Sequence, residues 1–242
     1  MTTFPIIRSV GLSGVLVSFA PAASDAANRA AIAFRGAVDA LDLPQIDESS
    51  STLVSAFFRV DLVAYPFASI RDALAEVLAE QDWFAAPLPA GRTLWTVPAV
   101  FGGDRAPQLD EAAAAAGVST PEAIADLTTT RLRVLTIGFA PGQPYLGTLA
   151  SHWDIPRQVG LTPKVPQGAL VAAVRQICLF AKETPTGWRH VGQSAFRCFQ
   201  PDAENPFPLA PGDEVQFTQI SAAELARLEA HVTDGATRTV LE

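Results

Sequence analysis

Short apolar runs broken by glycine and proline make up most of the chain, but two segments in its first third follow a helical period instead. Apolar positions within 26–41 and 67–81 recur every three or four residues, which predicts two amphipathic helices. Runs rich in β-branched and aromatic residues predict two short strands within 6–19 and single strands at 52–62 and 94–100. The order of these elements predicts a small α+β sandwich in which two helices cover one face of a sheet.

A proline- and glycine-rich segment, Pro87-Leu-Pro-Ala-Gly91, separates this region from the rest of the chain. Such composition is typical of a linker or a long connection. We therefore expect a domain boundary near residue 90, with an N-terminal sandwich domain at 1–90 and a second domain at 91–242.

Two short helices, at 108–116 and 121–127, are predicted at the start of the second domain, with Thr120 as the cap of the second helix and Pro121 as its first residue. A helix, a tight turn and a helix also outline a DNA-binding motif. The second helix carries Glu122 and Asp126 but no side chain suited to reading bases, which argues against that function.

From residue 131 onward, short β-type runs alternate with glycine and proline, a pattern typical of a closed or nearly closed antiparallel barrel. A helix at 222–232, capped by Ser221, follows the last strand. The predicted strands lie at 131–138, 169–174, 177–182, 188–191, 195–199 and 214–220.

Composition narrows the classes of partner. The chain has 242 residues, is 49% hydrophobic and carries a formal net charge of −8 with no cluster of lysine or arginine. We expect neither nucleic acid nor a membrane among its partners, because both attract basic surfaces. Gly11, Ser13 and Gly14 interrupt the apolar N-terminal stretch, so no leader peptide is expected and a cytoplasmic location is predicted.

The two cysteines, Cys178 and Cys198, both have apolar neighbours and are expected to be buried, reduced thiols. The three histidines, His152, His190 and His231, show no ligand spacing with them, so no metal site is expected.

Rigid loops are the most distinctive feature of the second domain, which has no GxSxG, Walker, HExxH or GxGxxG signature. Each loop combines proline, which fixes φ, with glycine, which lets the backbone approach a ligand or another chain closely. The loops are GFAPGQPYL at 138–146, IPR at 155–157, VPQGAL at 165–170, TPTGW at 184–188 and LAPGDEVQF at 209–217.

In this order, these loops resemble the family that contains allophanate hydrolase subunit 1 and the B subunit of 5-oxoprolinase. The family also includes the sporulation kinase inhibitor and is related to the carboxyltransferase domain, subdomains C and D, of urea carboxylase. The resemblance implies a cyclophilin-like β-barrel behind the small sandwich, and a complex with a homologous second subunit and possibly a third. It also implies that ATP serves the complex, which would open 5-oxoproline to glutamate or act on an allophanate-like amide.

Several positions depart from the family pattern. Gln143 replaces the phenylalanine of GFxPGFPYL, Leu161 and Thr162 replace a second Pro-Arg pair, and Leu127 and Leu132 align where members carry histidine and tyrosine. A leucine cannot transfer protons. These departures keep two alternatives open: a non-catalytic regulatory protein of the histidine-kinase-inhibitor type, and the structural half of a two-chain enzyme.

No catalytic residue can be named, but the loops supply candidates for binding a substrate or a partner. Phe139, Tyr145 and Trp188 either fill the core or line a pocket or a subunit contact. The planar fork of Arg157 suits a carboxylate, and Asp213 is expected to be a solvated turn charge. The candidates are Gly138, Phe139, Pro141, Gly142, Gln143, Tyr145, Arg157, Gly187, Trp188 and His190.

Overall fold

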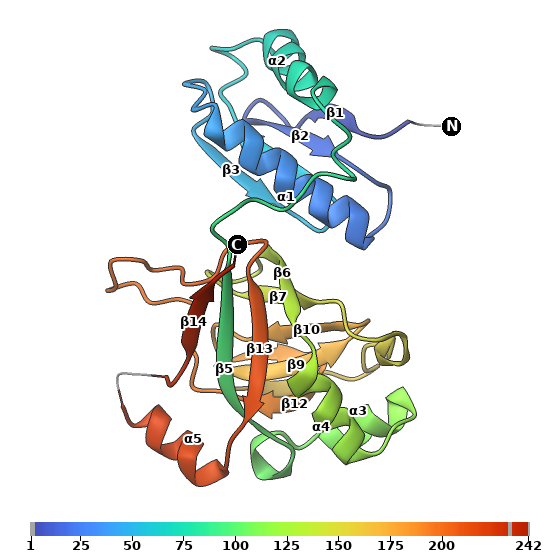
Figure 1. Cartoon of the computed structure of the whole chain (residues 1–242), viewed down its shortest axis with the longest axis vertical. Coiled ribbons are helices and arrows are strands. Elements are labelled where there is room, and N and C mark those ends of the chain that lie inside the picture. Colours follow the sequence, from blue (N-terminus) through green and yellow to red (C-terminus); the bar gives the residue numbers. More distant parts are fainter. Residues whose placement is uncertain (1–2, 232–233, 242) are drawn as a thin grey trace. The chain divides into compact units, whose positions relative to one another are not determined.

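The computed structural model describes residues 3–231 and 234–241. The chain divides between Ala90 and Gly91 into two compact units (Figure 1). Each unit is built around its own cluster of buried apolar side chains.

The N-terminal unit is a four-stranded antiparallel sheet with two helices on one face. The strands lie in the order β1-β2-β4-β3. Phe58 of the sheet, Phe34 of α1 and Leu74 of α2 meet in one core, which places both helices on the same side, as predicted. The elements are β1 (Ile6–Ser9), β2 (Gly14–Ser18), α1 (Asp25–Ala40), β3 (Glu48–Ser51), β4 (Ser55–Arg59) and α2 (Phe67–Ala79).

Local sequence explains most of these elements, with one exception. Ser24 caps α1 by accepting a hydrogen bond from the Ala27 backbone N–H at 3.2 Å. The strand predicted at 52–62 is shorter, at Ser55–Arg59, and a turn joins it to β3. β3 has the sequence ESSS and forms the sheet edge, so it carries no apolar alternation by which it can be predicted.

The second unit contains a closed barrel of seven strands. The strands lie in the order β12-β9-β10-β7-β6-β13-β5, and pairing of β5 with β12 closes the barrel. β14 pairs with β5 at residues 93–96. β5 and β13 run parallel, and the other ladders are antiparallel. The barrel strands are β5 (Thr93–Phe101), β6 (Leu132–Ile137), β7 (Pro144–Gly147), β9 (Ala169–Ala173), β10 (Gln176–Leu179), β12 (Arg189–Gln193) and β13 (Glu214–Gln219), with β14 at Thr237–Val240.

Short helices and a two-stranded sheet surround the barrel. Ser119, not Thr120, is the N-cap of α4; its side chain accepts from the Glu122 N–H while the Glu122 carboxylate accepts from the Ser119 N–H. The predicted end of the last helix at residue 232 lies outside the described residues. These elements are η1 (Gly103–Arg105), α3 (Leu109–Ala116), α4 (Thr120–Thr129), η2 (Ser151–Trp153), α5 (Ala222–Glu229) and the pair β8 (Thr162–Val165) and β11 (Thr184–Thr186).

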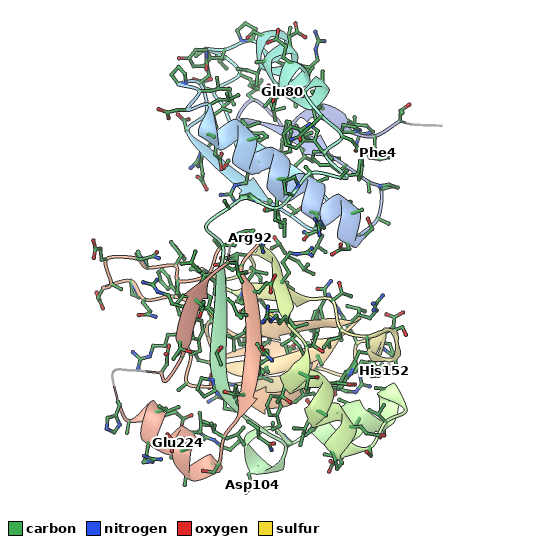
Figure 2. All side chains as sticks on the ribbon, viewed as in Figure 1. Phe4, Glu80, Arg92, Asp104, His152 and Glu224 are labelled. Carbon is green, nitrogen blue, oxygen red and sulfur yellow. The ribbon has the colours of Figure 1, made fainter. Side chains whose placement is uncertain are left out.

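Asp213 joins the entry of β13 to that of β5 and is buried rather than solvated, so the expectation of a surface turn charge is wrong. Its Oδ1 accepts from the Thr93 N–H at 2.7 Å and its Oδ2 from the Ala210 N–H at 2.9 Å. Arg92 lies at the start of β5 (Figure 2), where its guanidinium donates to the Gly212 carbonyl. Hydrogen bonds from two backbone N–H groups explain why a carboxylate is held there.

The predicted strand at 195–199 is not formed. Phe196 and Cys198 are buried and Arg197 is exposed, so the alternation that suggested a strand is present. The Cys198 carbonyl instead packs against Gly142, and no strand is assigned to residues 195–199. The in-and-out pattern therefore reflects packing of an extended loop rather than sheet pairing.

Both faces of the strands β7, β9 and β10 are buried. Leu146 and Ile177 point into the barrel core, whereas Tyr145 and Cys178 join a second cluster on the outer face. This outer cluster also contains Val165 of β8, so the small β8–β11 sheet covers it.

Candidate functional site

A pocket of about 230 Å³ opens on the outer face of the barrel, and we call it the outer-face pocket. Its walls come from β7, β10, β11 and the loops around them. The described lining residues are Phe139, Gln143, Tyr145, Arg157, Leu161, Cys178, Phe180, Thr184, Pro185, Thr186, Gly187 and Trp188.

Strand pairing brings the floor of the pocket together. Tyr145 of β7 lies directly opposite Cys178 of β10 in an antiparallel ladder, so both side chains lie on the same face. The Tyr145 ring meets Trp188 edge to face, with centroids 6.0 Å apart and an interplanar angle of 73°. Two residues from distant parts of the sequence thus form one aromatic wall.

The glycines of the 138–146 loop shape the pocket without lining it. Gly142 has φ +70°, and a Cβ there would lie 2.1 Å from the Cys198 carbonyl oxygen, so no larger residue fits. The Gly138 N–H donates to the Gln143 carbonyl at 3.0 Å and closes the turn. Pro141 is likewise not among the lining residues.

The two aromatic rings of this loop differ in their exposure to solvent. Tyr145 is half-buried in the pocket floor, whereas Phe139 is 74% exposed at the rim and has φ +70°. Neither ring fills the barrel core, since the inner cluster contains neither of them.

Gln143 is the polar residue deepest in the pocket, with 1% of its surface exposed. Its side-chain Oε1 accepts from the Ala181 backbone N–H at 3.3 Å. The amide therefore has a fixed orientation at the position where the family pattern has phenylalanine.

Arg157 supplies the one charge among the described lining residues. Its guanidinium carbon lies 5.5 Å from the centroid of the Trp188 ring, a cation–π arrangement. The Gln158 N–H donates to the Gly187 carbonyl at 2.7 Å and holds this segment against the TPTGW loop. This backbone hydrogen bond brings Arg157 to the pocket; a Cβ at Gly187 would make only ordinary contacts, the nearest with the Gln158 carbonyl oxygen at 3.4 Å.

The titratable groups of the pocket floor are both protonated at neutral pH. Burial raises the pKa of Tyr145, and Cys178 adds to this effect, while hydrogen bonding by Gln143 and the charge of Arg157 oppose it. Burial likewise raises the pKa of the Cys178 thiol. The described lining residues therefore offer hydrogen-bond donors and a positive charge, but no group that exchanges a proton near pH 7.

His190 lies away from this pocket. It is buried, and Gln108 pairs with its backbone, accepting from the His190 N–H at 2.9 Å through Oε1. Burial lowers the pKa of the imidazole, whose Nε2 has no hydrogen-bond partner among the described residues. Trp188 lines the pocket and His190 does not. The regular strand begins only at Arg189, so strand alternation need not relate these two side chains.

Several lining residues carry no signal of their own in the sequence. Cys178 and Phe180 reach the pocket through the β7–β10 pairing, which only the folded barrel reveals. Thr184, Pro185 and Thr186 also line the pocket. The sequence marks their loop, TPTGW, as rigid, but it does not single out these three residues.

A larger hollow of about 630 Å³ lies on another part of the barrel unit and is lined by residues such as Trp95, Phe199 and Asp202. It contains both acidic and basic side chains and none of the candidate residues. The outer-face pocket is the better candidate because Tyr145, Arg157 and Trp188, from three separate loops, converge there.

Both cysteines are free and buried, as predicted. Within residues 3–231 and 234–241, histidine, cysteine and acidic side chains form no group of three or more that suits a metal ion. Across the same residues, no helix combines the length and apolarity that crossing a bilayer requires.

Comparison with known families agrees with the barrel and its loops. The model of the carboxyltransferase domain, subdomain C and D, matches residues 5–209. The chain belongs to this family. The resemblance inferred from the loop motifs is thereby confirmed.

Named relatives come from several bacteria. The B subunit of 5-oxoprolinase from Bacillus subtilis is 32% identical over 159 residues, which cover 66% of this chain and 65% of that protein. The corresponding B subunit from Escherichia coli O157:H7 is 33% identical over 121 residues, or 50% of this chain and 56% of the relative. The chain thus matches somewhat less than two thirds of the length of these relatives.

A solved structure supports the fold. Urea carboxylase of Kluyveromyces lactis superposes with a TM-score of 0.75 at 15% identity, over 97% of this chain and 24% of that one. At this identity the likeness concerns the fold alone. The expected small sandwich followed by a closed barrel is confirmed.

Proposed function

We propose that this chain is a subunit of a 5-oxoprolinase-type complex and that its outer-face pocket binds the carboxylate of the substrate. The observation that carries this proposal is Arg157, which is held against Trp188 at the pocket mouth. Among the described residues Arg157 forms no ion pair, so its guanidinium is available to an anion. Guanidinium groups bind carboxylates in a bidentate manner.

The size and chemistry of the pocket support a small substrate. The pocket volume of about 230 Å³ lies below the roughly 300–1,000 Å³ typical of pockets for drug-sized ligands. A compact cyclic amino-acid derivative needs only a pocket of this smaller size. 5-oxoproline has one carboxylate and one lactam carbonyl. Arg157 would hold the carboxylate, and the Tyr145 hydroxyl is a donor for the carbonyl.

The pocket also explains why this chain would work with a partner. Opening a lactam needs donors aimed at the developing oxyanion and a group that moves a proton. Tyr145 and Arg157 can serve as donors, but the proton carrier has no candidate among the described lining residues. We assign that group, together with ATP, to the complex with a homologous second subunit and possibly a third.

Calorimetric titration of the purified chain with 5-oxoproline tests the carboxylate site. Arg157→Lys keeps the charge but loses the planar fork, and we expect affinity to fall about tenfold, as loss of one hydrogen bond to a charged group implies. Arg238→Lys is the matched control, because Arg238 also lies over a tryptophan ring, at 5.8 Å from Trp95, but outside the pocket. Equal affinities for wild type and Arg157→Lys would remove Arg157 from the site.

A regulatory protein that binds another protein is the second candidate function. Phe139 and Leu161 both line the pocket and are 74% and 67% exposed, so this part of the surface offers apolar side chains that another protein could cover. Co-expression with a homologous second subunit of the 5-oxoprolinase type distinguishes the two candidates. A well-folded complex that does not hydrolyse ATP in response to 5-oxoproline would favour the regulatory function.

A further inference from the structure

We infer that Gln158 positions Arg157 in the outer-face pocket, so that the affinity of the pocket for carboxylates depends on a glutamine that does not line it. This inference rests on the proposed function, since it concerns the same pocket. It adds a positioning residue behind the pocket and connects the pocket to the start of α3.

The segment that carries Arg157 lies mostly in solvent. Among residues 156–161, Gln158 alone is half-buried and the others are exposed. Packing alone therefore cannot fix Arg157, and the position of its guanidinium over the Trp188 ring needs another cause. The cause matters for binding, because a long side chain that moves freely must be ordered when it binds a ligand.

Gln158 fixes this segment against the residues that precede β12. Its side-chain Nε2 donates to the Trp188 carbonyl at 3.1 Å, and its backbone N–H donates to the Gly187 carbonyl at 2.7 Å. A carbonyl only accepts, so the nitrogen end of the amide must face Trp188. The residue next to Arg157 is thus bonded to the same tryptophan over whose ring the guanidinium lies.

A second glutamine, Gln108, holds the Gln158 amide in this orientation. Gln158 Oε1 accepts from Gln108 Nε2 at 2.9 Å, and Gln108 Oε1 accepts from the His190 N–H at 2.9 Å. This chain of hydrogen bonds begins and ends on the backbone, at His190 and Trp188, so neither amide can reverse without losing a bond. Gln108 is also the residue that precedes α3, which connects the start of this helix to the pocket.

Arg189 holds the other neighbour of Arg157. Its Nη1 donates to the Pro156 carbonyl at 2.7 Å, and its Nε donates to Glu111 of α3 at 2.9 Å. With 11% of its side chain exposed, Arg189 has little freedom to move away. Both neighbours of Arg157 are therefore bound to the 187–189 segment, which leaves the guanidinium at the pocket mouth.

Calorimetric titration with 5-oxoproline tests whether Gln158 contributes to carboxylate binding. Gln158→Met keeps the length of the side chain but removes the amide. We expect affinity to fall about two- to tenfold, the effect of ordering one long side chain on binding. Gln108→Met leaves Gln158 bonded to Trp188, so we expect a smaller loss. Equal affinities for Gln158→Met and wild type would overturn the inference.

Gln216→Met is the matched control. Gln216 is also half-buried, and its Nε2 also donates to a distant backbone carbonyl, that of Thr128, at 3.1 Å. This bond joins β13 to α4 and includes no residue of the segments around Arg157, so the variant should keep the affinity of wild type. A loss as large as that of Gln158→Met would assign the effect to general loosening of the barrel and would overturn the positioning role.

NMR tests the position of Arg157 without any ligand. The ring current of Trp188 should shift side-chain protons of Arg157 upfield, and Arg157→Lys identifies these signals. In Gln158→Met the shift should fall toward the value of an unstructured arginine, whereas Gln216→Met should keep it. A shift that Gln158→Met leaves intact would overturn the inference, even if the variant is less stable. If Gln158→Met does not fold, Gln108→Met provides the same test with a smaller expected change.

The two proposals can fail separately. If wild type does not bind 5-oxoproline, the carboxylate site of the proposed function fails, and the NMR shift alone decides the role of Gln158. If wild type and Gln158→Met bind equally, the proposed function stands and the positioning role fails.

Discussion

Gly142 in the 138–146 loop gives the sharpest test of the barrel geometry. Its φ of +70° favours glycine, and a Cβ at this position would lie 2.1 Å from the Cys198 carbonyl oxygen and 2.8 Å from the carbonyl carbon. Gly142→Ala therefore has two costs. The left-handed conformation costs about 1–2 kcal/mol, and forcing backbone atoms apart in a packed region costs about 1–3 kcal/mol more.

Gly117 separates these two costs. It caps α3 at φ +72°, close to the angle of Gly142, but an added Cβ there would meet nothing within 4 Å. Gly117→Ala should show the conformational cost alone. The difference between the two variants, about 1–3 kcal/mol, should thus report the contact between Gly142 and Cys198.

Thermal unfolding followed by tryptophan fluorescence measures this difference. Three of the four tryptophans, Trp95, Trp153 and Trp188, lie in the second unit, so the signal is dominated by the barrel. At roughly 2–4 °C per kcal/mol, Gly142→Ala should melt about 2–12 °C below Gly117→Ala. Equal melting temperatures would show that the loop moves aside freely, and would refute the claim that Gly142 holds it in place.

Two further predictions concern buried titratable groups. Burial lowers the pKa of the His190 imidazole in the folded chain, whereas the same group has a pKa of about 6.5 in the unfolded chain. As the pH falls, the unfolded chain therefore takes up this proton at a higher pH than the folded chain does. Stability should decline below about pH 6.5, and His190→Gln should flatten that decline in urea titrations across this range. Asp213→Asn places an amide donor opposite the N–H group of either Thr93 or Ala210. The free energy of unfolding measured in urea should therefore fall by about 1–3 kcal/mol. An unchanged urea midpoint would show that these hydrogen bonds add no stability.

The sequence predicts the parts of the fold that local patterns determine. Helices α1 and α2 and most barrel strands follow from the apolar period and the turn residues. β3 was missed because ESSS has no apolar alternation, and β7 was missed because it lies inside the GFAPGQPYL loop. The strand predicted at 195–199 is wrong because buried and exposed side chains alternate there although the segment is not assigned to a strand.

The candidate site was predictable as a set of loops but not as a pocket. Proline and glycine mark GFAPGQPYL, IPR and TPTGW as rigid, and the structure brings one lining residue or more from each together. Their convergence depends on the pairing of β7 with β10 and on the contact of Gln158 with Gly187. These contacts are between distant segments, so no local pattern encodes them, and the same holds for the burial of His190 outside the pocket.

The same short loop links the stability of the barrel to the chemistry of the pocket. Gly142 packs against Cys198, and the side-chain oxygen of the next residue, Gln143, accepts from the Ala181 N–H. Any side chain at Gly142 would push the loop away from Cys198 and shift the Gln143 amide with it. The hydrogen bond from Ala181 offsets part of the cost of burying this amide, because a buried amide without a partner costs about 1–3 kcal/mol. The buried amide of Gln143 therefore depends on the position that Gly142 gives to the loop.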